Sequence, residues 1–106
     1  MKIDFLFFTG CPNSAPTLRR LFEMLASEDI VAEVNEIEIA DAAWAARHRF
    51  LGSPSIRIDG DDIDPAARAR RTYGLMCRTY PGGAGIPPVD MIRRALREHL
   101  AQGRNL

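Results

Sequence analysis

The chain has 106 residues, 46% of them hydrophobic, and its fourteen basic and fourteen acidic side chains give a formal net charge of zero. This length predicts one domain, residues 1–106, with a modest core. Balanced charge gives no general attraction to nucleic acid or to a membrane surface, and no apolar run approaches the ~18 residues of a membrane span. Two cysteines are too few for a secreted disulfide scaffold. We therefore expect a cytoplasmic protein whose thiols stay reduced unless they react.

The first half of the chain predicts strands alternating with helices. Residues 3–8 form an almost continuous apolar run, which is typical of a strand buried on both faces. Residues 12–28 carry apolar side chains at helical spacing. A second strand is predicted over 31–39, with a bulge near Asn35 because the apolar alternation changes phase there. A short alanine-rich helix over 42–51 begins after Asp41 and ends at Gly52.

The second half predicts a hairpin and a last helix. Residues 55–58 and 61–64 flank Asp59-Gly60, a strong hairpin signal. Residues 65–86 indicate no regular element, and the glycines at 82, 83 and 85 are interpreted as a mobile connector. Pro87-Pro88 open a helix that Gly103 is expected to end. The order predicts an α/β fold, βαβαββα, with a four-stranded mixed sheet and helices on both faces.

Cys11 is the first candidate for chemistry, because it falls between the end of a strand and the start of a helix. Free backbone N–H groups and the helix dipole place positive partial charge at that position. Such surroundings lower a thiol pKa and favour the reactive thiolate over an inert buried cysteine. Ser14 is expected either to cap the helix or to donate a hydrogen bond to the Cys11 sulfur.

Two segments carry a resemblance to a known superfamily: Gly10-Cys11-Pro12-Asn13-Ser14, and Gly52-Ser53-Pro54 directly before a strand. With the predicted element order, the chain resembles the thioredoxin-like superfamily, and its Cys-Pro site is similar to that of glutaredoxins. The resemblance covers about residues 1–64 and 87–102, so residues 65–86 are an inserted loop. It implies that Cys11 is the nucleophile and that Pro54 is a cis-proline packed against it.

A late stretch, Tyr73 to Tyr80, adds a closer similarity to a small bacterial group of thioredoxin family proteins, some associated with mercury-resistance genes. The second cysteine usual in such sites is replaced by Ser14. Cys77 is therefore predicted either to act with Cys11, or to be a loop cysteine without a partner. The pair fits a disulfide or a two-coordinate site for a soft metal such as Hg(II). The spacing of other ligands does not suggest tetrahedral zinc.

The resemblance implies a thiol–disulfide redox protein whose partner is a protein or small-molecule disulfide, with Cys77 or glutathione as the resolving thiol. No cofactor other than glutathione is expected, and Ser53 and Arg78 are predicted to contact it. Arg68, Arg70 and Arg71 either bind the same anion or form a solvated face. Two alternatives remain open: a module that binds mercury or another thiol ligand, and a redox-inactive interaction domain. The chain is expected to be a monomer or a homodimer, without nucleic-acid or membrane partners.

Overall fold

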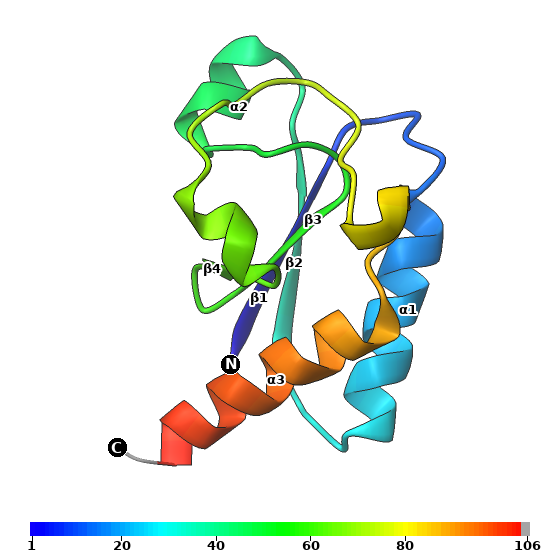
Figure 1. Ribbon diagram of the computed structural model, residues 1–106, viewed down its shortest axis with the longest axis vertical. Coiled ribbons are helices and arrows are strands. Elements are labelled where there is room, and N and C mark those ends of the chain that lie inside the picture. The colour runs from blue at the N-terminus through cyan, green and yellow to red at the C-terminus, as the bar shows by residue number, and fades with distance from the viewer. Residues whose placement is uncertain (105–106) are drawn as a thin grey trace.

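The computed structural model describes residues 1–104, in which four strands and three α-helices alternate along the chain (Figure 1). The strands are β1 (Lys2–Phe7), β2 (Glu33–Glu38), β3 (Ser55–Ile58) and β4 (Asp61–Asp62), and the α-helices are α1 (Ser14–Ser27), α2 (Ala42–Arg47) and α3 (Val89–Arg104). Two 3-10 helices, η1 (Pro65–Ala69) and η2 (Pro81–Gly83), lie in the 65–86 segment. Within residues 1–104, none of the helices combines the length and the apolarity needed to cross a membrane.

The four strands form one mixed sheet in the order β2-β1-β3-β4, which confirms the predicted α/β class. β1 and β2 are parallel, whereas β3 is antiparallel to both β1 and β4. The predicted bulge near Asn35 is wrong, because β1 and β2 pair continuously through Asn35. The change of phase has another cause: Val34 packs into the core on one face of the sheet, and Ile37 into the core on the other.

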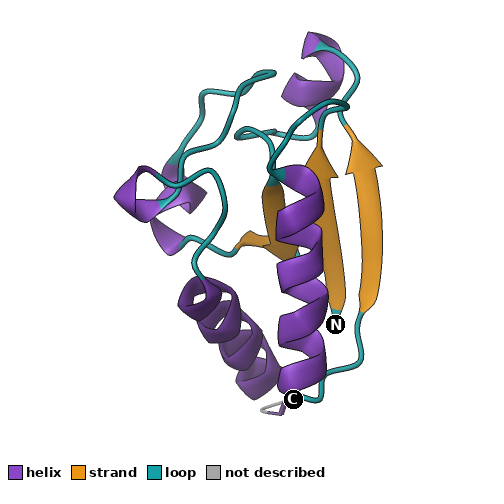
Figure 2. Cartoon of the chain, turned by 90° about the vertical axis from the view of Figure 1, so that its right-hand side faces the viewer, coloured by secondary structure: helices purple, strands orange, loops and turns teal. Residues whose placement is uncertain are grey.

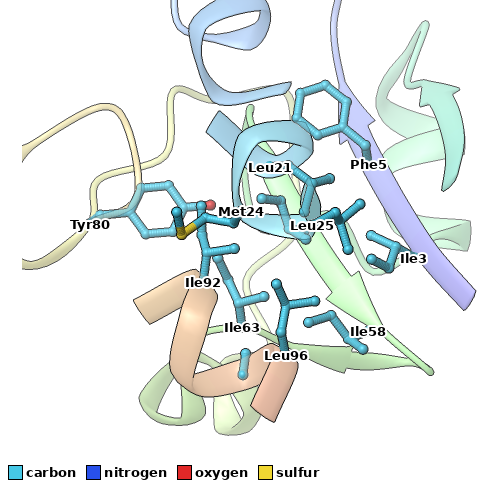
Figure 3. Packing of buried hydrophobic residues seen from close by; sticks show 12 residues of the cluster. Ile3, Phe5, Leu21, Met24, Leu25, Ile58, Ile63, Tyr80, Ile92 and Leu96 are labelled. Atoms are coloured by element: carbon cyan, nitrogen blue, oxygen red, sulfur yellow. The ribbon is translucent and has the colours of Figure 1, made fainter. Parts of the chain in front are cut away.

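Each face of the sheet has its own core, because side chains alternate along a strand. Phe5 of β1 belongs to the larger core, which lies between the sheet and helices α1 and α3 (Figures 2 and 3). Leu6, the next residue, belongs to the smaller core under α2, with Ile39, Ala45 and Phe50. Helices therefore cover both faces, but α2 has only six residues and lies over one end of the sheet (Figure 2).

Several element boundaries differ from the prediction. Helix α1 begins at Ser14 rather than at Pro12, and α2 ends at Arg47, shortly before Arg49 adopts a positive φ of 53°. A left-handed residue there ends the helix before Gly52 is reached. Strand β4 contains only Asp61 and Asp62. Helix α3 continues through Gly103, because one glycine costs a helix only about 1 kcal/mol and does not by itself end it.

Candidate functional site

Cys11 lies in the turn between β1 and α1, where the residue is 9% exposed. Burial raises the pKa of this thiol, but hydrogen bonds from the hydroxyls of Ser14 and Ser53 and from the backbone N–H groups of Asn13 and Ser14 lower it by more. The net pKa is therefore below that of an ordinary cysteine, because the thiolate is stabilised more than it is desolvated. This direction agrees with the expectation from the strand–helix junction.

Ser14 and Ser53 form a small hydroxyl network around the Cys11 thiol. Their Oγ atoms lie 3.3 Å apart, and both hydrogen-bond to Cys11. The Ser53 Oγ also accepts a hydrogen bond of 3.3 Å from the Phe8 N–H at the end of β1. Ser14 is thus the hydrogen-bond partner of the thiol and not the cap of α1, since the cap position is Asn13. Both hydroxyls can turn a proton toward a thiolate when it forms.

Ser53 also joins the site to Cys77 through the backbone. The Ser53 N–H donates to the Met76 carbonyl at 2.8 Å, and the Arg78 N–H donates to the Ser53 carbonyl at 3.0 Å. These two bonds make a parallel β-bridge between Ser53 and Cys77. Both cysteines are free thiols, Cys11 buried and Cys77 exposed. The structure therefore brings the segment that carries Cys77 to the residue that hydrogen-bonds Cys11.

The loop before β3 fits closely against this segment. The Ser53–Pro54 bond is cis, as the resemblance implies. Gly52 has a φ of 117°, and a Cβ atom added to it would come within 3.1 Å of the Arg78 backbone. Only glycine satisfies both conditions without strain. Gly52, which the sequence predicts as the end of a helix, instead allows the 76–78 segment to approach Ser53.

Arg78 anchors the segment in the interior. Arg78 is 3% exposed, and its guanidinium donates two hydrogen bonds to the Asp62 carboxylate, of 2.6 and 2.7 Å. It also donates to the Ser55 Oγ at 3.1 Å and lies over the Tyr80 ring, 4.5 Å from its centre. The contact with glutathione predicted for Arg78 stays a prediction, but here both terminal nitrogens are bound to Asp62.

Tyr80 holds the next part of the 65–86 segment. It is fully buried in the larger core, where Figure 3 shows its ring beside Met24, and its hydroxyl donates to the Pro54 carbonyl at 2.6 Å. Burial raises the pKa of Tyr80, so its hydroxyl keeps its proton and acts as a donor. The phenol therefore ties the cis-proline loop to the larger core.

The glycine stretch that follows is a hydrogen-bonded turn. The Tyr80 N–H donates to the Ala84 carbonyl at 2.7 Å, which closes the turn around η2. A Cβ atom on Gly85 would lie 2.3 Å from the Asn13 Nδ2, so the end of the turn packs directly against the residue before α1. In Figure 1 the 65–86 segment passes from η1 over the end of the sheet and comes down beside the start of α1. It thus packs against the turn that carries Cys11.

Sequence reasoning missed the residues that hold this arrangement together. The sequence indicates Asp62 only as part of the strand predicted over 61–64, and Tyr80 only as the end of the Tyr73–Tyr80 stretch of the resemblance. No local pattern marks a buried ion pair between residues sixteen positions apart. Among residues 1–104, no group of three or more His, Cys, Asp or Glu side chains is placed to hold a metal ion. A two-coordinate metal site at Cys11 and Cys77 stays a prediction.

Comparison with family models, with curated proteins and with solved structures gave no match to this chain. The chemistry of the site rests on its own atoms: a buried thiol with a lowered pKa at a helix start, two serine hydroxyls beside it, and a second thiol on a segment bridged to one of those serines.

Proposed function

We propose that this protein is a thiol–disulfide redox protein with a thioredoxin-like fold, in which Cys11 attacks as a thiolate. The observation that carries the proposal is the set of hydrogen bonds from Ser14, Ser53 and the backbone that lowers the pKa of the Cys11 thiol. A thiolate, not a thiol, is the nucleophile in disulfide exchange. The strand order β2-β1-β3-β4, with β1 and β2 parallel and the hairpin antiparallel, supports the fold resemblance.

The reaction begins when the Cys11 thiolate attacks one sulfur of a disulfide substrate. A Cys11–substrate disulfide forms, the substrate disulfide breaks, and the departing thiolate takes a proton from water. A second thiolate then attacks the Cys11 sulfur and releases the remaining substrate half as a thiol. Two electrons pass from the protein to the substrate, and the resulting protein disulfide is reduced again by a low-molecular-weight thiol such as glutathione.

Cys77 is the proposed resolving thiol. Residues paired across two neighbouring strands present their side chains on the same face of the sheet. Cys77 pairs with Ser53, and the Ser53 hydroxyl reaches the Cys11 thiol. Cys77 is exposed, so it can attack a disulfide formed on Cys11 without unfolding of the core. The two hydrogen bonds between Ser53 and the 76–78 segment hold Cys77 beside this residue, while Arg78 stays bound to Asp62.

Oxidation of the wild type and of Cys77→Ser in parallel tests Cys11 as the nucleophile and Cys77 as the resolving thiol. With oxidised glutathione, the wild type should lose two thiols and two mass units and remain monomeric. Cys77→Ser should instead accumulate one glutathione adduct on Cys11, located by peptide mapping. Cys11→Ser is the matched control and should form an adduct only slowly, at Cys77. Equal adducts at equal rates in the wild type and in Cys77→Ser would remove Cys77 from the mechanism and leave Cys11 as a monothiol.

A second candidate function is binding of a soft metal ion by the same two thiols. The β-bridge between Ser53 and Cys77 favours metal binding, because it holds one free cysteine, Cys77, against the residue whose hydroxyl hydrogen-bonds the other, Cys11. Thiolates are the preferred ligands of soft metals. Titration with Hg(II) should then consume both thiols at one ion per chain, with no turnover of a disulfide substrate. A stoichiometry of two ions per chain, one on each cysteine, would argue against a shared site.

A further inference from the structure

A second feature of the molecule lies away from the Cys11 turn: a cavity of about 230 Å³ lined by arginine side chains. We call it the arginine cavity. It lies between β3, the β3–β4 hairpin, η1 and the residues after α2. Its polar lining is dominated by five arginines, joined by one tyrosine: Arg49, Arg57, Arg68, Arg70, Arg71 and Tyr73.

The positive charge of this cavity is not balanced from within the protein. Two carboxylates also line it, but Asp62 is bound to Arg78 and Asp61 to His99. Asp4, opposite Arg57 on β1, accepts a hydrogen bond from Asn35. In the part of the chain that the structure describes, none of the five lining arginines has a carboxylate oxygen within 4.0 Å. Five guanidinium groups thus share one small volume with two carboxylates, which leaves the cavity with an excess of positive charge.

The guanidinium groups are held in place by backbone carbonyls. Arg57 donates to the Arg49 carbonyl at 2.7 Å, and Arg68 donates through Nε to the Asp62 carbonyl at 3.0 Å. Arg71 donates to the carbonyls of Arg68 and Arg70. A guanidinium has five N–H donors, so each group keeps several for a ligand. Burial lowers the pKa of the half-buried Arg57, and the carboxylates of Asp62 and Asp4 only partly offset that effect.

We propose that the arginine cavity binds a phosphate group, either free phosphate or the monoester of a small molecule. A phosphate monoester carries a charge of about −1.5 to −2 and three acceptor oxygens, which matches several guanidinium forks better than one carboxylate does. The cavity is smaller than the roughly 300–1,000 Å³ of sites for drug-sized ligands, so the ligand is small. The formal net charge of zero gives no long-range attraction to a nucleic-acid backbone.

The arginine cavity is separate from the redox site but adjoins it. Leu51 and Arg70 line both the arginine cavity and a neighbouring cavity whose wall includes Cys77. The proposed phosphate site does not depend on the redox function. In the part of the chain that the structure describes, none of the five arginines of the cavity forms a hydrogen bond or ion pair with Cys11. A protein without any thiol activity would still bind phosphate here.

Titration of the reduced, full-length chain tests the proposal. Inorganic phosphate and a simple alkyl phosphate monoester are added at constant ionic strength, with binding followed by ³¹P NMR and by the rise in melting temperature. Saturable binding at one site per chain is expected, and the tighter of the two ligands identifies the source of the phosphate. A dicarboxylate that binds as tightly as both phosphates would overturn the phosphate assignment, and a short oligonucleotide that outcompetes them would overturn the small-molecule assignment.

Matched variants locate the site. Arg68→Gln/Arg71→Gln removes two exposed members of the cavity and should weaken phosphate binding at least about tenfold, since charge-assisted hydrogen bonds to phosphate are lost. Arg57→Gln removes a half-buried member of the cavity and should also weaken phosphate binding. Arg19→Gln removes the same single charge as Arg57→Gln, but from the exposed face of α1, and should leave the affinity unchanged. Binding that never saturates, or that falls equally in Arg19→Gln, would show adventitious screening and would refute the site.

Discussion

At the scale of single residues, the reactivity of Cys11 depends on two hydroxyl groups. Ser14 replaces the second cysteine usual in the resembled family, and the structure shows what that hydroxyl does: it hydrogen-bonds the thiol from the first turn of α1. Ser53 does the same from the loop before β3. Hydroxyl groups from two segments that are distant in the sequence therefore reach the thiol. Its pKa depends on how the loop before β3 packs against the turn between β1 and α1.

The alkylation rate of Cys11 should titrate with a midpoint below the ~8.5 of a free thiol. Ser14→Ala and Ser53→Ala should each move the midpoint upward, because each removes a donor that stabilises the thiolate. The measurement is the rate of iodoacetamide labelling against pH in a Cys77→Ser background, which isolates one thiol. Ser27→Ala, at the far end of α1, is the control and should leave the midpoint where it is. A wild-type midpoint at or above ~8.5 contradicts the activated thiolate.

At the scale of elements, a buried ion pair holds the 65–86 segment against the sheet. Arg78 and Asp62 have side chains 1% and 6% exposed, and they join this segment to β4. Removing one partner of such a pair leaves the other charge buried and unpaired, which costs about 3–5 kcal/mol. The ion pair therefore fixes where Cys77 lies, through its neighbour in sequence.

Arg78→Leu should lower the free energy of unfolding by about 3–5 kcal/mol, measured by urea denaturation. Arg78→Leu/Asp62→Leu should recover much of that loss, because no charge is then left buried. Arg93→Leu breaks an exposed pair with Asp90 and should cost at most about 1 kcal/mol. If Arg78→Leu behaves like Arg93→Leu, the buried pair does not hold the segment.

At the scale of the whole molecule, the lowered pKa of Cys11 links folding to pH. The thiol ionises at lower pH in the folded chain than in the unfolded chain, where its pKa is about 8.5. The resulting stabilisation is fully present above the unfolded pKa and is lost as the pH falls through the folded pKa. The folded state should therefore gain stability from this group as the pH rises toward ~8.5.

Comparison with Cys11→Ser isolates that contribution from all other titrating groups. The free energy of unfolding of the wild type minus that of Cys11→Ser should increase with pH and level off above about pH 8.5. Chemical denaturation under reducing conditions, at several values from about pH 5 to about pH 9, gives the difference directly. A difference that stays flat or falls over this interval would mean that folding does not stabilise the thiolate.

The sequence by itself determined the order of the elements and the position of the thiol. Local signals suffice for these: the apolar run before Thr9-Gly10, the helical spacing from Leu18 to Leu25, and Asp59-Gly60 at the hairpin. Each depends on the conformation of a few neighbouring residues, which side-chain shape and backbone freedom decide. The cysteine between strand and helix followed from the same local rules.

Only the tertiary structure decided what surrounds that thiol. The bridge from Ser53 to Cys77, the ion pair of Arg78 with Asp62 and the contact of Gly85 with Asn13 all join residues far apart in the chain. No periodicity encodes such contacts, because they arise when separate elements pack and each buried polar group must find a partner. The arginine cavity has the same origin: Arg49 and Arg57 meet Arg68, Arg70 and Arg71 only after the hairpin and η1 fold beside β3.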